Sequence, residues 1–321
     1  MAKIRNIGIQ NKPPLDTLAQ LRKSDVKLSG KLTTLQKRAR SKWYTENIAL
    51  RLKYTVNQND KLYKMYSHAA NCCSLMTQTN GNEIKSKFCN TRICNVCNRI
   101  RTAKMMNGYI SQMQKFSSIE FITLTIPNCK AEDLPGTIAI MYKEIYNIIG
   151  VFRKKKDSIH GIRKLEITYN NETDTYHPHY HLLIEGGKGK LIVNEWLKRF
   201  PKANIKGQDY READNNSLNE IFKYTTKILF KNKENKGSFL IIANAINTIM
   251  SAMYGKRSIQ AFGCIRKVSE EVDEDIKILS YEGVKEYEFM EWIWNSCDWV
   301  NKVNETLSGY INPDIEFVLI E

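Results

Sequence analysis

The sequence lacks any apolar run long enough to cross a membrane. No stretch of about 18 consecutive apolar residues occurs, so no transmembrane helix and no membrane partner are expected. The charged start, Met1 to Arg5, has no apolar segment behind it, which argues against a secretory signal. These absences predict a cytoplasmic protein. The eight cysteines are then expected to be reduced thiols or metal ligands, because cytosolic proteins seldom keep disulfides.

Acidic residues are scarce in the first third of the chain and crowded near its end. Residues 1–104 hold 21 Lys and Arg against 5 Asp and Glu, and residues 105–269 hold 25 against 15. Residues 270–321 reverse the balance, with 3 against 14. The net charge of +15 therefore lies in front of an acidic tail. Basic charge segregated in this way favours a nucleic-acid partner over charge kept for solubility alone.

Histidine is also rare, yet three of the five histidines fall within five positions, at His177, His179 and His181. Alternating aromatic and β-branched residues predict a half-buried strand over residues 177–184. Side chains two apart on a strand share a face, so His179 and His181 point the same way. Two neighbouring imidazoles can clamp a metal ion. His177, at the mouth of the strand, is a weaker candidate ligand, and a strand without metal is the alternative interpretation.

A second strand is predicted over residues 161–169, and a polar turn joins it to the histidine strand in a hairpin. The expected register places Glu166 opposite Tyr180, and a shift of one residue places it beside His179 or His181. A carboxylate and two imidazoles that leave coordination positions open suit Mg²⁺ or Mn²⁺ better than a closed zinc site. The alternative for Glu166 is a solvated strand residue.

A helix is predicted over Ser217–Phe230, with its first residue as the N-cap and Glu220 completing a capping box. Glu220, Tyr224 and Lys227 then share one face. A tyrosine beside a carboxylate and an ammonium can attack a phosphodiester, and Lys223 and Lys227 would favour its phenolate and bind the phosphate. Taken alone, this spacing also fits an ordinary salt-bridged surface.

Five cysteines cluster in sequence, and the spacing Cys-x4-Cys-x2-Cys with a doubled cysteine upstream predicts a tetrahedral Zn²⁺ site. The candidate ligands are Cys72, Cys73, Cys89, Cys94 and Cys97. His68 could replace the upstream cysteine, and reduced cysteines packed in a core are the alternative. The basic residues Arg99, Arg101 and Lys104 follow the cluster and are predicted to contact nucleic acid.

Other elements are predicted from hydrophobic periodicity. Strands are expected over residues 121–126 and 258–268, helices over 102–116, 134–152, 193–200 and 240–254, and a polar connection over 201–216.

Three segments, taken in order, resemble the three motifs of HUH-type rolling-circle replication initiators. They are Phe-Ile-Thr-Leu-Thr at residues 121–125, His-Pro-His-Tyr-His at 177–181 and the segment at 220–227. The match is similar to the plasmid Rep family that contains the small staphylococcal plasmid initiators. The cysteine cluster is similar to that family's N-terminal cysteine motif, and residues 255–263 are similar to its region after the tyrosine. The resemblance covers about residues 70–270.

The resemblance implies an α+β HUH endonuclease fold, with a central antiparallel sheet of about five strands, packed helices and a small N-terminal cysteine (zinc) region. It implies a metal-dependent, site-specific single-strand endonuclease and strand transferase. His179 and His181, with Glu166, would bind the catalytic metal. Tyr224 would attack plasmid origin DNA at a single-stranded or cruciform nick site, leaving a 5′-phosphotyrosyl link. Glu220 would act as general base for water in the terminating cleavage, and host helicase and replication machinery are the implied partners.

We therefore expect four segments: a basic N-terminal arm with helices over 1–67, a cysteine-rich region over 68–104, an HUH nuclease domain over 105–269 and an acidic region over 270–321.

The alternative functions are an HUH transposase or relaxase-like strand transferase, or a non-catalytic zinc-containing DNA-binding regulator. The tyrosine follows the histidine motif, which disfavours a relaxase. A single tyrosine in the helix motif disfavours the two-tyrosine enzymes. No motif assigns recognition of an origin sequence.

Overall fold

The computed structural model describes most of the chain from residue 32 onward. The described residues are 32–79, 83–222, 230–231, 238–272, 275–277, 289–312 and 315–320. Lys223, Tyr224 and Lys227, which are predicted to act on DNA, lie outside them. Residues 1–33 and 34–321 form separate units, and the fold described below belongs to the second. Within the described part of the chain, every helix is too short or too polar to serve as a membrane span.

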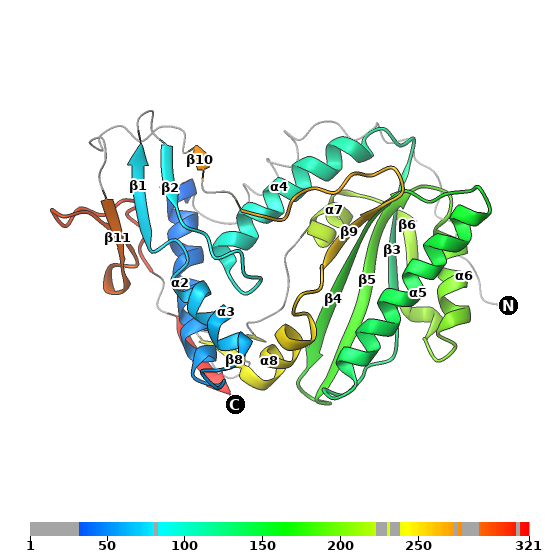
Figure 1. Cartoon of the computed structure of the whole chain (residues 1–321), viewed down its shortest axis with the longest axis horizontal. Coiled ribbons are helices and arrows are strands. Elements are labelled where there is room, and N and C mark those ends of the chain that lie inside the picture. The colour runs from blue at the N-terminus through cyan, green and yellow to red at the C-terminus, as the bar shows by residue number, and fades with distance from the viewer. Residues whose placement is uncertain are drawn as a thin grey trace. The chain divides into compact units, whose positions relative to one another are not determined.

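A five-stranded antiparallel sheet carries the histidine motif, with strand order β6-β3-β5-β4-β9 (Figure 1). Its strands are β3 (Ile119–Thr125), β4 (Gly161–Asn170), β5 (Thr175–Glu185), β6 (Asp209–Glu212) and β9 (Ile259–Phe262). β4 and β5 form the predicted hairpin, in a register that pairs Glu166 with His179 and Leu165 with Tyr180. The prediction of an antiparallel α+β sheet of about five strands is confirmed, and the register differs from the first expectation by one residue.

One face of this sheet is apolar and is covered by helices. The covering helices are α5 (Leu134–Lys154), α6 (Gly189–Arg199) and α8 (Ala243–Ala252). Figure 1 shows α5 and α6 lying side by side across the strands. Tyr180, Leu182 and Ile184 of β5 project to this side because they alternate with the histidines, and all three are fully buried. Burial of each such side chain contributes about 1.5–3 kcal/mol, which fixes the opposite face for the polar residues.

The histidine face is covered by α7 (Asn215–Phe222), which packs on α4 (Asn95–Met113). The Thr102 hydroxyl donates to the Phe222 carbonyl at 3.0 Å, and the Phe222 ring stacks on Tyr109. The predicted N-cap at Ser217 is wrong. Asp214 caps the helix: its Oδ1 accepts from the backbone N–H of Ser217 at 2.7 Å. The Ser217 hydroxyl also donates to this carboxylate, so the reciprocal box starts three residues earlier than predicted.

The helices before the cysteine cluster and the region after residue 270 share a second core. Helices α2 (Thr34–Lys53) and α3 (Lys61–Ala70) pack against a sheet of order β10-β2-β1-β11-β12. Its strands are β1 (Leu75–Thr79), β2 (Glu83–Ser86), β10 (Asp275–Lys277), β11 (Phe289–Ile293) and β12 (Asp298–Val300). Trp299 of β12 is fully buried, and its indole N–H donates to the Cys73 carbonyl at 2.7 Å. The described residues of the expected N-terminal and acidic segments therefore contribute to one core.

Two of the elements predicted after the histidine strand differ from the structure. The expected polar connection contains a 3₁₀ turn, η2 (Ile205–Gly207), and the edge strand β6. The sequence of β6, Asp-Tyr-Arg-Glu, has no apolar alternation because the strand is mostly exposed. The expected helix over 240–254 begins as strand β8 (Ser238–Ile242), which pairs in parallel with β13 (Glu316–Ile320) and antiparallel with β7 (Phe230–Lys231). Its apolar run fits either element, and pairing partners decide between them.

Candidate active site

The β4–β5 register brings Glu166, His179 and His181 into one group. The ligand atoms of the three side chains all lie within 4.8 Å of one another, and all three residues are buried. Directly paired residues of antiparallel strands project to the same face, and so do residues two apart. The hairpin therefore places these three residues together. Its register is the alternative considered from the sequence, one residue away from the pairing of Glu166 with Tyr180.

Each imidazole has one nitrogen held by a neighbour. Nδ1 of His179 lies 3.1 Å from the His177 carbonyl, and because a carbonyl only accepts, this nitrogen carries the proton. The Nε2 lone pair of His179 is then available as a ligand. Nδ1 of His181 lies 3.2 Å from the Thr123 hydroxyl of β3, and Nε2 lies 3.7 Å from Oε2 of Glu166. Such contacts orient imidazole ligands toward a metal.

The two imidazoles are neutral in this environment. Burial lowers the pKa of His179, and burial lowers the pKa of His181 to about 3, with the neighbouring charge of His179 acting in the same direction. The nearby charge of Glu166 opposes both shifts without reversing them. Neutral imidazole is the form that binds a metal ion.

His177 lies beside this group and makes other contacts. Its Nδ1 lies 2.8 Å from Oδ1 of Asn128, and its ring stacks on His179 with centroids 5.1 Å apart. It is not among the three residues whose ligand atoms converge. His177 therefore lies next to the candidate ligand group without belonging to it.

Lys164 and Arg211 lie at the site but were not predicted as site residues from the sequence. Lys164 is 3% exposed, and its ammonium lies 3.0 Å from Oε2 of Glu166 and 2.9 Å from the backbone carbonyl of Glu220. Arg211, on the edge strand β6, lies over the ring of Phe121, which in turn stacks on His181. The position of Lys164 two residues before Glu166 was a usable signal, because the two share a strand face.

Helix α7 brings Glu220 to the histidine face. The bond from Lys164 holds its backbone, and the charge of its carboxylate is one of those acting on His179. Tyr224 follows two residues after the last described residue of this helix, Phe222. The arrangement can hold a divalent cation on one face of the sheet beneath α7, with a carboxylate of the helix nearby.

The cysteine cluster also converges. Sulfur atoms of four of the five candidates lie within 4.8 Å of one another: Cys72, Cys89, Cys94 and Cys97. Cys73 is buried outside this group, and His68 is an exposed residue of α3 that is also outside it.

The basic residues after the cluster have different surroundings. Arg101 is 3% exposed and donates to the carbonyls of Asn90 and Glu270, so the guanidinium is used inside the protein and its predicted DNA contact is not supported. Lys104 donates to the carbonyl of Glu271 at 2.9 Å, and Arg99 is exposed on α4.

Comparisons with known proteins agree with these features. A family model described as "Replication protein" matches residues 81–189. A relative from Staphylococcus aureus named "Protein rep" is 33% identical over 165 residues, which cover 44% of this chain and 71% of the relative. A "Protein rep" from Bacillus is 30% identical over 227 residues, covering 59% of this chain and 72% of the relative. No solved structure gives a significant match. The chain belongs to the replication-protein family, the plasmid Rep initiators that its three motifs resemble.

Proposed function

We propose that this Rep protein starts rolling-circle replication by nicking one strand at the double-strand origin of its plasmid, with Tyr224 as the nucleophile. One observation carries the proposal: Glu166, His179 and His181 converge within 4.8 Å on the sheet face beneath the helix that leads to Tyr224. A buried group of this kind has the donor set for a divalent cation, and it lies beneath α7, which holds the first described residues of the helix motif.

The three residues fit Mg²⁺ or Mn²⁺. The imidazoles are neutral, the Nδ1 contacts leave Nε2 free to bind, and the carboxylate supplies the oxygen ligand that both ions favour. When bound, the ion polarises the scissile phosphate and offsets the charge that develops on it.

The remaining chemistry falls to side chains of the helix motif. The Tyr224 oxygen attacks the phosphorus, the bond from phosphorus to the 3′ oxygen breaks, and that oxygen takes up a proton to become the 3′-OH primer. Lys223 and Lys227 supply positive charge to the phenolate and the phosphate. At termination Glu220 takes a proton from the water that attacks in the second cleavage. Attack of a 3′-OH on the phosphotyrosine rejoins the strand and releases the tyrosine.

Single-stranded or cruciform origin DNA is the proposed substrate. The net charge of +15 supports a polyanionic partner. Arg211, 48% exposed beside the histidine face, is a candidate phosphate contact, as is Arg99 on α4. Host helicase and replication proteins are the further partners that the family implies. A transposase or relaxase-like strand transferase would use the same chemistry on other DNA.

A second candidate is a DNA-binding regulator without catalysis. The 3.0 Å contact between Lys164 and Glu166 favours it, because an ion pair can satisfy this carboxylate without a metal. The two candidates predict opposite results in a single assay.

The test is to trap the covalent adduct with a labelled single-stranded origin oligonucleotide. We expect an adduct with the wild type and with Tyr54→Phe, whose tyrosine is 81% exposed and far along the chain. We expect none with Tyr224→Phe. Nicking of a supercoiled origin plasmid by Tyr224→Phe would exclude the nucleophile assignment, and nicking in chelator would count against the metal.

A further inference from the structure

Four cysteine thiols meet in the second core, from separate points of the chain. Cys72 follows α3, Cys89 lies in the loop after β2, Cys94 is the N-cap of α4 and Cys97 lies in its first turn. The sulfur of Cys97 lies 3.6 Å from that of Cys72 and 3.7 Å from that of Cys89. Four sulfurs bound at about 2.3 Å to one zinc ion are about 3.8 Å apart, whereas a disulfide brings sulfurs to about 2.05 Å. The observed spacing therefore fits a shared ion.

Backbone amides point at these sulfurs. The N–H of Cys89 donates to Sγ of Cys72 at 3.4 Å, and the N–H of Cys97 donates to Sγ of Cys94 at 3.4 Å. The N–H of Thr91 donates to Sγ of Cys89 at 3.5 Å. Amide donors favour the charged thiolate, and so does the N-terminal end of α4. This is the contact pattern expected around metal ligands.

A buried cation lies close to the cluster. Arg38 of α2 is 7% exposed, and within the described part of the chain its Nη1 has no hydrogen-bond partner. Burial lowers the pKa of Arg38, and charge on Cys73 or Cys72 would raise it again. Four neutral thiols supply no counter-charge, whereas one zinc ion with four thiolates carries a net charge of −2. A zinc-bound cluster would place negative charge near a guanidinium that is otherwise costly to bury.

We propose that Cys72, Cys89, Cys94 and Cys97 bind one structural zinc ion, and that this ion fixes the loop between Cys89 and Cys94. Four protein ligands close the coordination sphere, so the site is distinct in kind from the open histidine group. An iron–sulfur cluster fits poorly because its cysteines bind different irons and are held farther apart.

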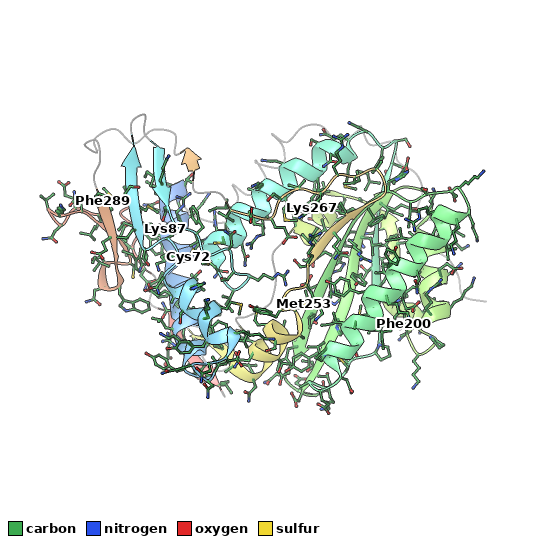
Figure 2. All side chains as sticks on the ribbon, viewed as in Figure 1. Cys72, Lys87, Phe200, Met253, Lys267 and Phe289 are labelled. Carbon is green, nitrogen blue, oxygen red and sulfur yellow. The ribbon has the colours of Figure 1, made fainter. Side chains whose placement is uncertain are left out.

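The fixed loop forms hydrogen bonds with the chain segments before and after strand β9. Arg92 donates to the carbonyl of Met253 at 2.9 Å and also to that of Lys256, ahead of the strand. Oδ1 of Asn90 accepts from the N–H of Val272 at 2.8 Å, beyond the strand. Figure 2 labels one residue at each end of this connection: Cys72 of the cysteine cluster and Met253, whose carbonyl accepts from Arg92. β9 pairs with β4, the strand of Glu166, so the zinc loop supports the outer edge of the sheet that carries the histidines.

Metal analysis tests the ligand set. We expect one zinc per purified full chain, complete loss of zinc in Cys97→Ser, and full retention in Cys73→Ser, whose buried thiol adjoins the cluster without joining it. Cobalt exchanged into the wild type should give the absorption of a tetrahedral tetrathiolate, a measurement that needs no variant to fold. Iron in place of zinc, no bound metal, or loss of zinc only in Cys73→Ser would overturn the proposal.

Hydrogen exchange tests the support of β9. Removing zinc should speed exchange of the Val272 amide, which bonds directly to the loop. Arg92→Gln should keep its zinc and speed exchange at the amides of residues 253–256. Unchanged exchange after zinc removal would overturn the supporting role. All of these measurements can be made in Tyr224→Phe protein, so they stand apart from the nicking proposal.

Discussion

The ammonium of Lys164 lies 3.0 Å from Oε2 of Glu166 on one face of β4, and both side chains are buried. The same ammonium donates to the Glu220 carbonyl, so one cation joins a candidate metal ligand to the helix above it. Without a bound ion, Lys164 supplies the compensation that a buried carboxylate requires. With an ion bound, the carboxylate has two cationic partners.

Replacing Lys164 with Met should destabilise the metal-free protein strongly. Breaking a buried ion pair by removing one partner costs about 3–5 kcal/mol, because the other charge stays buried and unpaired. Added Mn²⁺ should restore part of the loss, since a ligand that binds only the folded state stabilises it. Urea unfolding with and without Mn²⁺ measures both effects. Lys198→Met is the matched control: its pair with Glu195 is 2.9 Å long with Lys198 70% exposed, and its loss should cost at most about 1 kcal/mol.

Glu166→Gln should weaken Mn²⁺ binding by at least about tenfold, since the amide keeps the shape but loses the charged oxygen ligand. Calorimetric titration measures the affinity. Glu172→Gln, in the exposed turn of the same hairpin, should bind Mn²⁺ as the wild type does. Equal affinities for the wild type and Glu166→Gln would remove Glu166 from the ligand set.

Asp214→Ala should cost about 1 kcal/mol of stability, the usual value of an N-cap. Hydrogen bonds from Ser217 lower the pKa of Asp214. A lowered carboxyl pKa stabilises the fold above the unfolded value of about 3.9, and the contribution is lost as pH falls through the folded pKa. The difference between wild type and variant should therefore be full at neutral pH and shrink below about pH 4. Glu220→Ala should change the free energy of unfolding by no more than about 0.5 kcal/mol. A larger loss would support the capping box between Ser217 and Glu220 that was predicted from the sequence.

Trp299→Ala should destabilise the protein by about 3–5 kcal/mol, since it removes a fully buried indole from the second core. Trp294→Ala, five residues earlier and 41% exposed, is the control and should cost much less. Thermal unfolding of the full chain measures both. Similar values for the two variants would mean that the region after residue 270 does not share the core.

The histidine hairpin was predictable because alternation and turn chemistry act over short distances. β4, β5 and the shared face of His179 and His181 follow from a strand period of two, whereas the convergence of Glu166 with them depends on the register. The exact register did not follow, since one residue of turn length decides it. β6 escaped prediction because an exposed edge strand needs no apolar alternation, and the order of β8 and α8 escaped because an apolar run suits both elements.

The cysteine cluster was predictable in membership but not in detail. Spacing identified Cys89, Cys94 and Cys97, yet the choice of Cys72 over Cys73 depends on the backbone turn at Cys73, which has φ of 57°. The partners of Arg101 and the shared core depend on contacts between segments more than 160 residues apart in sequence, as from Arg101 to Glu270. Local pattern carries no information about such contacts.

The pairing of Leu75 in β1 with Glu291 in β11 has a consequence during protein synthesis. A ribosome releases α2, α3 and the cysteine loop long before it makes the strands that close their sheet, and such long-range pairing forms late. A chain that stops before residue 289 exposes the edge of β1 and the apolar side chains that β11 and β12 would cover. Cellular proteases act on chains of that kind. A truncated chain of this kind would therefore keep the histidine motif and the tyrosine without a finished fold.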